Sequence, residues 1–234
     1  MSVSIGLLTE NFSIIAADDR GTYPEPRDGK KYEDGCEKIF LTKFGWVAQH
    51  GGIYLTLKFF QRFFETHEIK TRRHIYTGFL LASKETDKYA KPIRSCTTTY
   101  LYSINYFKGG VINMGIEILD FEYKHRKLKS KNVLIVQPPK ETKRIKALIE
   151  RYADMVKAAQ DIHQAIYLIA CFMHELSKLS QLVSNNVTCG ISYRLSDTEV
   201  IMMKVSENAK KIKQLYEKKQ NLSEVMFVFD NTNL

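Results

Sequence analysis

The pattern of apolar and polar residues divides the first half of the chain into short strands followed by two helices. Short apolar runs bounded by turn-forming residues are typical of buried strands. These runs are residues 3–8, 13–17, 37–42 and 45–50. After Gly51 and Gly52, apolar residues recur at helical spacing to about His67, and a second helix is predicted from about Arg73 to Lys88. Residues 21–35 are rich in Gly, Pro and Asp and are expected to form a loop or an irregular strand.

In the second half of the chain, segments with strand-like patterns are again followed by segments with helical spacing of apolar residues. Its predicted strands are residues 96–107, 111–123, 132–137, 186–193, 198–205 and 225–229, and its predicted helices are residues 141–157, 160–180 and a segment from about Glu207. Blocks of strands that alternate with pairs of helices suit two packed sheets covered by helices. We therefore expect an α+β fold, a four-layer αββα sandwich of two antiparallel sheets between helix layers. A parallel doubly wound sheet with a phosphate-binding turn is not expected, because neither GxGxxG nor GxxxxGK[ST] occurs.

Length and composition are those of a globular chain without long linkers. The 234 residues include only 12 Gly and 5 Pro, and we expect one domain spanning residues 1–234. The N-terminal sequence MSVSIGLLTE has no secretory signal pattern, and no apolar run approaches the ~20 residues that span a bilayer. A cytoplasmic protein without a membrane partner is the expectation.

Metal and cofactor sites are not expected. The four cysteines lie far apart, without CxxC spacing, and are expected to be reduced thiols. His50 and His174 lack a second ligand at HExxH-like spacing, and His174 is expected to be an ordinary helix histidine.

The formal charge of +9 raises the question of nucleic-acid binding. Basic residues gather in residues 124–131, 140–146 and 210–219. The first cluster is expected to be a turn between strands, and the others have helical spacing with interleaved Glu, as on solvated helix faces. No recognition-helix or RNP-like pattern accompanies them. Charge alone supports only nonspecific association, so a nucleic-acid partner is not expected.

The N-terminus offers a self-contained catalytic unit. Met1 is followed by the small residue Ser2, the usual context for removal of the initiator methionine. Ser2 would then carry both a hydroxyl nucleophile and a free α-amine, whose ordinary pKa of about 7.7–8.0 suits it to accept the hydroxyl proton. A Met-Ser start alone is common and carries little weight.

Four further segments follow in an informative order. Ser2-Val3-Ser4-Ile5-Gly6 leads to Ala16-Ala17-Asp18-Asp19-Arg20, then to Glu37-Lys38-Ile39-Phe40, and then to Ala48-Gln49-His50-Gly51-Gly52 at the start of a helix. This order resembles the beginning of proteasome β subunits and their bacterial relatives, which are N-terminal-nucleophile hydrolases. The resemblance covers residues 2–67, and the order of the remaining elements agrees with the αββα sandwich of that family.

The resemblance implies a role for each matching residue. Ser2 stands at the nucleophile position, Lys38 at the position of a lysine beside it, and Asp18 at the position of the acidic residue that orients this lysine. A buried ammonium would lower the pKa of a neighbouring hydroxyl and amine, and a carboxylate would keep that ammonium charged. Gly52 matches the glycine whose N–H binds the oxyanion. Gly51 and Arg20 are expected to support the cluster.

Two departures from the family pattern keep alternatives open. The nucleophile is Ser instead of the usual Thr, and the family's Asp-x-x-Ser before a Gly-Gly pair is replaced by residues 180–186, where Ser180 or Ser184 could substitute. Individually, Asp18, Asp19 and Arg20 also suit a strand-end turn, Lys38 an exposed strand position, and Gly51-Gly52 a loop.

The resemblance therefore implies an amide hydrolase, a peptidase acting on peptide or protein substrates without a cofactor, in a homo-oligomeric ring. A catalytically inactive structural or regulatory ring subunit is the alternative. The apolar stripe Leu55, Phe59, Phe60 and Phe63 suits either a contact between ring neighbours or burial within one chain.

Overall fold

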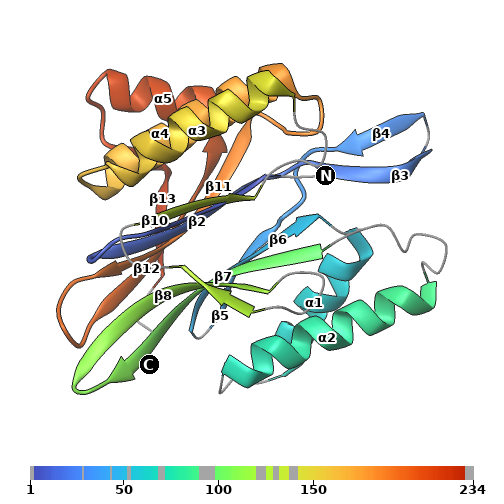
Figure 1. Ribbon diagram of the computed structural model, residues 1–234, viewed down its shortest axis with the longest axis horizontal. Coiled ribbons are helices and arrows are strands. Elements are labelled where there is room, and N and C mark those ends of the chain that lie inside the picture. The colour runs from blue at the N-terminus through green and yellow to red at the C-terminus, as the bar shows by residue number, and fades with distance from the viewer. Residues whose placement is uncertain are drawn as a thin grey trace.

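Two antiparallel sheets face each other, and helices cover the outer side of each (Figure 1). The computed structural model describes residues 3–27, 29–42, 44–51, 54–67, 72–89, 98–119, 125–128, 132–136 and 142–229. In these ranges the expected α+β, four-layer αββα sandwich is confirmed. It is the solution for sheets that are apolar on both faces, since each inner face packs on the other and each outer face packs on helices.

The first sheet carries the N-terminal hairpin in its middle. Among the described residues its strand order is β10-β1-β2-β11-β12-β13. The strands are β1 (Ser4–Leu8), β2 (Phe12–Asp18), β10 (Asn132–Val136), β11 (Asn186–Arg194), β12 (Val200–Asn208) and β13 (Met226–Phe229). Every residue of β1 and β2 is buried, as expected for central strands with both faces covered.

The second sheet has the order β5-β6-β7-β8-β9. Its strands are β5 (Ile39–Thr42), β6 (Gly45–Gly51), β7 (Thr98–Lys108), β8 (Val111–Leu119) and β9 (His125–Lys127). The basic cluster expected as a turn thus contains a short edge strand. A separate hairpin, β3 (Gly21–Arg27) with β4 (Lys30–Glu33), forms where a loop or an irregular strand was expected.

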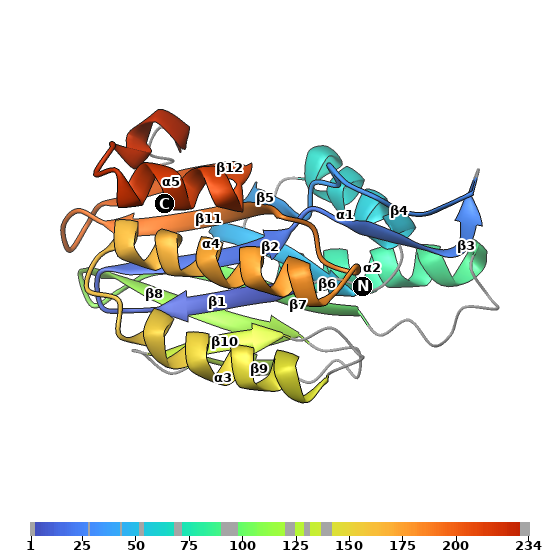
Figure 2. The same cartoon turned by 90° about the horizontal axis from the view of Figure 1, so that it is seen from above.

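One group of helices lies on the first sheet and another on the second (Figures 1 and 2). The first group is α3 (Lys143–Lys157), α4 (Ile162–Leu179) and α5 (Ala209–Glu217), and the second is α1 (Tyr54–Thr66) and α2 (Arg72–Tyr89). A short 3-10 turn, η1 (Leu222–Val225), precedes β13. Side-chain caps at Thr142 and Asp161 accept from the first turns of α3 and α4, which fixes where these helices begin.

The aromatic stripe of α1 packs within the chain. The Phe60 ring is fully buried, with its centroid 4.4 Å from that of Phe79 and 5.2 Å from that of Tyr100. Phe59 and Phe63 are partly buried against the same cluster. These three residues therefore cover the outer face of the second sheet and do not form a free surface for a ring neighbour; the side chain of Leu55 lies outside the described residues.

Trp46 joins the two sheets through the inner layer of the core. It extends from β6, is fully buried, and donates its indole N–H to the carbonyl of Ile191 on β11, at 2.9 Å. Gly190 provides the space, because a Cβ there would lie 2.4 Å from a ring carbon of Trp46. Across the described part of the chain, no helix is long and apolar enough to cross a membrane.

Candidate functional site

The N-terminal hairpin places Asp18 beside the start of the chain. Ser4 pairs with Ala17 in the β1–β2 register, so the next position outward sets Val3 opposite Asp18. The Val3 N–H donates to Asp18 Oδ1 at 3.0 Å. Val187 of β11 pairs with Asp18 on its other side, which brings residues 184–186 to the same edge. The site therefore forms where the end of β2 meets the starts of β1 and β11.

Lys38 and Asp18 form a buried ion pair. Lys38 immediately precedes β5, and its Nζ lies 3.1 Å from Asp18 Oδ1, within the hydrogen-bond distance expected from the sequence. The Asp18 side chain is fully buried and that of Lys38 is 9% exposed. Few charged side chains are this buried in folded proteins unless they are paired.

Asp18 accepts hydrogen bonds on both carboxylate oxygens. Oδ1 accepts from Val3 N and Lys38 Nζ, and Oδ2 accepts from the N–H groups of Arg20, at 3.0 Å, and Ser184, at 3.5 Å. All four of these groups are donors, as the acceptor oxygens of a carboxylate require.

The Arg20 guanidinium points away from this pair. It forms two hydrogen bonds to Asp34, at 2.6 and 2.8 Å, donates to the carbonyl of Gln181 at 2.7 Å, and lies 4.2 Å above the centre of the Tyr32 ring. The hydrogen bond from Arg20 holds the pKa of Asp34 below its ordinary value. Of Arg20, only the backbone N–H contacts Asp18, and its side chain joins the end of β4 to the segment after α4.

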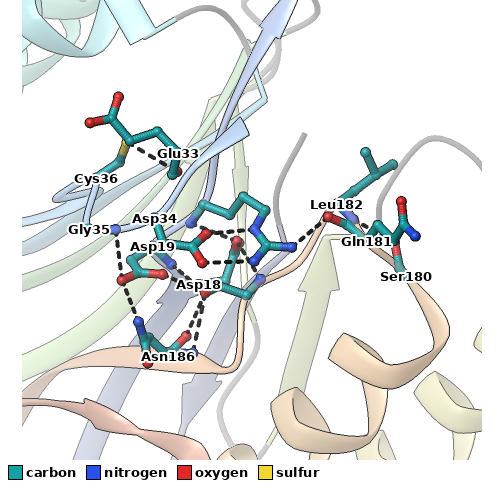
Figure 3. Close-up of polar contacts among 12 residues, drawn as sticks. Asp18, Asp19, Glu33, Asp34, Gly35, Cys36, Ser180, Gln181, Leu182 and Asn186 are labelled. Atoms are coloured by element: carbon teal, nitrogen blue, oxygen red, sulfur yellow. Dashed lines mark hydrogen bonds and ion pairs between the residues drawn. The ribbon is translucent and has the colours of Figure 1, made fainter. Parts of the chain in front are cut away.

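Asp19 anchors the segment before β11 (Figure 3). One oxygen of Asp19 accepts from Gly35 N at 3.0 Å and from Asn186 Nδ2 at 2.9 Å, and the other accepts from Ser184 Oγ at 2.5 Å. The sequence left Ser180 and Ser184 open as substitutes for the family serine. Ser184 is buried beside Asp18 and Asp19, whereas the Ser180 hydroxyl accepts only the nearby Leu182 N–H among the hydrogen bonds of the described residues.

Two of the residues singled out by the sequence, Ser2 and Gly52, lie outside the described residues. Gly51 is the last residue of β6 and pairs with Thr98 of β7. The structure thus brings together Asp18, Lys38 and the backbone of Arg20, and adds Asp19 and Ser184, whose roles the sequence did not assign.

Three cysteines lie in the described part of the chain, and each is buried. Cys36, Cys171 and Cys189 are free thiols. Burial raises the pKa of Cys36, and it raises the pKa of Cys189 to about 12. Within the described ranges, no group of three or more His, Cys, Asp or Glu side chains is arranged to hold a metal ion.

Comparison with known proteins relates the chain to others by fold. No protein-family model and no curated protein matches the sequence. Solved structures do match along almost the whole chain. Anbu from Hyphomicrobium sp. strain MC1, in a Gly-1 mutant, aligns with a TM-score of 0.63 at 10% identity over 94% of both chains. Another structure of Anbu from this strain gives 0.61 at 11% identity, over 93% of this chain and 94% of Anbu.

A third similar structure is Anbu from Yersinia bercovieri, described as an ancestral beta-subunit. It aligns with a TM-score of 0.61 at 10% identity and covers 93% of this chain and 94% of the other. At this identity the likeness concerns the fold alone. The chain therefore has a proteasome-like fold, as the resemblance of its N-terminal segments implies.

Proposed function

We propose that the chain, a single domain over residues 1–234, is a proteasome-like amide hydrolase. It is a peptidase that uses Ser2 as its nucleophile after removal of Met1. The observation that carries the proposal is a shared contact: Asp18 Oδ1 accepts both the Lys38 ammonium and the N–H of Val3, the residue that follows Ser2. A buried ammonium is thereby fixed beside the N-terminal strand, and the fold of the Anbu structures supports the same reading.

Each residue has a defined part in the proposed reaction. Ser2 supplies the hydroxyl and the α-amine, and Lys38 lowers the pKa of both by its positive charge. Asp18 holds Lys38 in place through the buried ion pair. The N–H of Gly52 stabilises the oxyanion, and the backbones of Gly51 and Arg20 support the cluster.

The proposed chemistry proceeds in two halves. Ser2 Oγ bonds to the substrate carbonyl carbon, its proton passes to the Ser2 α-amine, and the carbonyl electrons move onto the oxygen. Collapse of this intermediate breaks the C–N bond, and the protonated amine transfers the proton to the leaving nitrogen. Water then attacks the acyl ester by the same route and regenerates Ser2.

The test combines processing, labelling and turnover. Intact mass spectrometry establishes whether Met1 is removed, and the processed protein is then treated with a peptide epoxyketone and with a fluorogenic peptide library. We expect Ser2→Ala and Lys38→Ala to abolish both labelling and turnover, and Ser2→Thr to retain activity. Lys213→Ala is the matched control, since the Lys213 ammonium lies on the outer helix α5, 3.7 Å from Glu217.

A processed Ser2 that neither labels nor turns over substrate would refute the enzymatic proposal. The chain would then be a noncatalytic protein of the same fold.

We also propose that copies of the chain assemble into a closed homo-oligomeric ring. The support is the fold shared with a protein described as an ancestral beta-subunit. The aromatic stripe of α1 gives no support, since its described members pack within the chain. Light scattering coupled to size exclusion should give a multiple of 27.1 kDa, and a monomer at micromolar concentration would contradict the ring.

A further inference from the structure

A chain of side-chain hydrogen bonds runs from helix α4 to Asp19. His174 Nδ1 lies 2.8 Å from Asn185 Oδ1, and Asn185 Nδ2 donates to Asn208 Oδ1 at 3.1 Å. Asn208 Nδ2 donates to Asn186 Oδ1 at 3.2 Å. Asn186 Nδ2 then donates to Asp19 Oδ2 at 2.9 Å. We call Asn185, Asn208 and Asn186 the asparagine chain.

The acceptor at its end fixes the direction of the whole asparagine chain. An ionised carboxylate only accepts hydrogen bonds, so Asn186 must turn its NH2 group toward Asp19 and its carbonyl oxygen toward Asn208. The same requirement passes to Asn208 and then to Asn185. The last oxygen faces His174 Nδ1, so that nitrogen must carry a proton.

The sheet register and a helix cap hold the three amides in line. Asn186 and Asn208 are directly paired at the end of the β11–β12 ladder. Asn208 is also the N-cap of α5, where its Oδ1 accepts from Lys210 N at 3.0 Å. The Asn185 carbonyl accepts from Ala209 N at 2.8 Å. Each backbone position is therefore set by secondary structure, and the side chains extend from it toward Asp19.

Asp19 connects the asparagine chain to the buried pair of Asp18 and Lys38 through Ser184. Its other oxygen accepts from Ser184 Oγ, and the Ser184 N–H faces Asp18 Oδ2. Capping α5 requires only Asn208. The bonds from Asn208 to Asn186 and from Asn186 to Asp19 continue beyond the cap and end on a carboxylate that contacts Ser184, next to Asp18.

We infer that the asparagine chain is a positioning network for the proposed catalytic pair. By fixing Asp19, and through it Ser184, it sets the orientation of Asp18 and hence of Lys38. The inference rests on the proposed function. Its members touch neither substrate nor the reacting atoms, so they are positioning residues.

Asn208→Asp separates positioning from capping. The new carboxylate still accepts from Lys210 N and from Asn185 Nδ2, and an N-cap aspartate suits a helix N-terminus. It has no donor for Asn186, which then faces two carboxylates and satisfies only one of them. We expect kcat to fall about tenfold, in line with the loss of orientation at a reacting group, while KM stays close to wild type. The unsatisfied amide should lower the unfolding midpoint, so circular dichroism is used to check that the variant is fully folded at the assay temperature.

Asn113→Asp is the matched control, because it makes the same substitution at an amide that also donates hydrogen bonds, to the carbonyls of Lys108 and Val111, but in β8 beside the β7–β8 turn. We expect its kcat to equal that of wild type. An Asn208→Asp enzyme with unchanged kcat, or one whose kcat falls only in proportion to lost folded protein, would overturn the inference.

A spectroscopic measurement tests the hydrogen-bond direction without turnover. Imidazole ¹⁵N shifts of His174, recorded where the ring is neutral, should show a protonated Nδ1 in wild type and in Asn208→Asp, and a shift toward protonated Nε2 in Asn185→Ala. Protonated Nε2 in the wild type would overturn the asparagine chain. A processed wild type that is inactive refutes both proposals, whereas an active wild type with an unaffected Asn208→Asp refutes only this one.

Discussion

The buried Asp18–Lys38 pair should respond asymmetrically to loss of either partner. Lys38→Met removes the ammonium but retains an apolar stem of similar length, and Asp18 keeps the N–H donors of Val3, Arg20 and Ser184. Three remaining donors continue to stabilise the carboxylate, so the loss resembles that of one charged hydrogen bond, about 1.5–3 kcal/mol.

Asp18→Asn should cost more. All four groups around the carboxylate are donors, so an amide NH2 at either oxygen position faces N–H groups and leaves two of them unsatisfied. The Lys38 ammonium, 9% exposed, also loses its charged partner. Removing one partner of a buried pair typically costs about 3–5 kcal/mol.

Urea unfolding followed by circular dichroism measures both changes and is independent of activity. The double variant Asp18→Asn with Lys38→Met should lose less stability than the sum of the single losses, by at least about 1 kcal/mol, since neither charge is then left alone. Additive losses, or a cost for Lys38→Met larger than that for Asp18→Asn, would refute the reasoning. The slope of the urea dependence should be unchanged, so that midpoints compare directly.

Three further predictions concern other parts of the molecule. Gly190→Ala places a Cβ 2.4 Å from a ring carbon of Trp46 and should destabilise the protein by about 1–3 kcal/mol, with a shift in the fluorescence of this single tryptophan. Asp34→Asn removes the ion pair with Arg20; because this pair lowers the pKa of Asp34, the stability difference from wild type should be full above the ordinary pKa of 3.8 and vanish as pH falls through the folded value. Cys189, with a pKa of about 12, should resist iodoacetamide at pH 8 in the folded protein and react in urea, as followed by peptide mass spectrometry.

Each of these three predictions can be contradicted by a specific result. Gly115→Ala is the control for Gly190→Ala, since its Cβ would meet only a methyl group of Ile104, at 3.3 Å, and equal losses for both variants would contradict the packing argument. A stability difference for Asp34→Asn that does not diminish as the pH falls below 3.8 would count against the ion pair. Rapid alkylation of folded Cys189 would show that β11 opens locally.

The local sequence pattern predicted the helices and strands well, but it predicted less well which of them contact one another. The spacing of apolar residues located the N-terminal hairpin, the helix pairs and the C-terminal strand. It could do so because a strand or helix that is buried on one or both faces needs apolar residues at regular positions along its own sequence. The β3–β4 hairpin was less clear, since Gly21, Pro24 and Pro26 resemble loop residues. The short edge strand β9 was missed because His125, Arg126 and Lys127 carry the charges that edge strands tolerate.

The candidate site was predictable where the family resemblance covers it, and less so at the start of β11. Asp18 and Lys38 followed from the resemblance, but the choice of Ser184 over Ser180 depends on β11 pairing with β2. The asparagine chain likewise joins residues that are adjacent only through the β11–β12 register. A polar Ser-Asn-Asn run directly before an apolar strand was the available signal, and it does not identify a partner such as Asp19.

Because β1 and β2 lie in the middle of the first sheet, they are synthesised long before some of the strands that pair with them. Ile5 pairs with Ile135, and Asp18 pairs with Val187, so β1 and β2 leave the ribosome well before these partners are translated. At roughly 5–20 residues per second, that delay is on the order of ten seconds, far longer than a hairpin needs to form. The β1–β2 hairpin can therefore form alone, and both of its outer edges stay open until the rest of the first sheet closes around them.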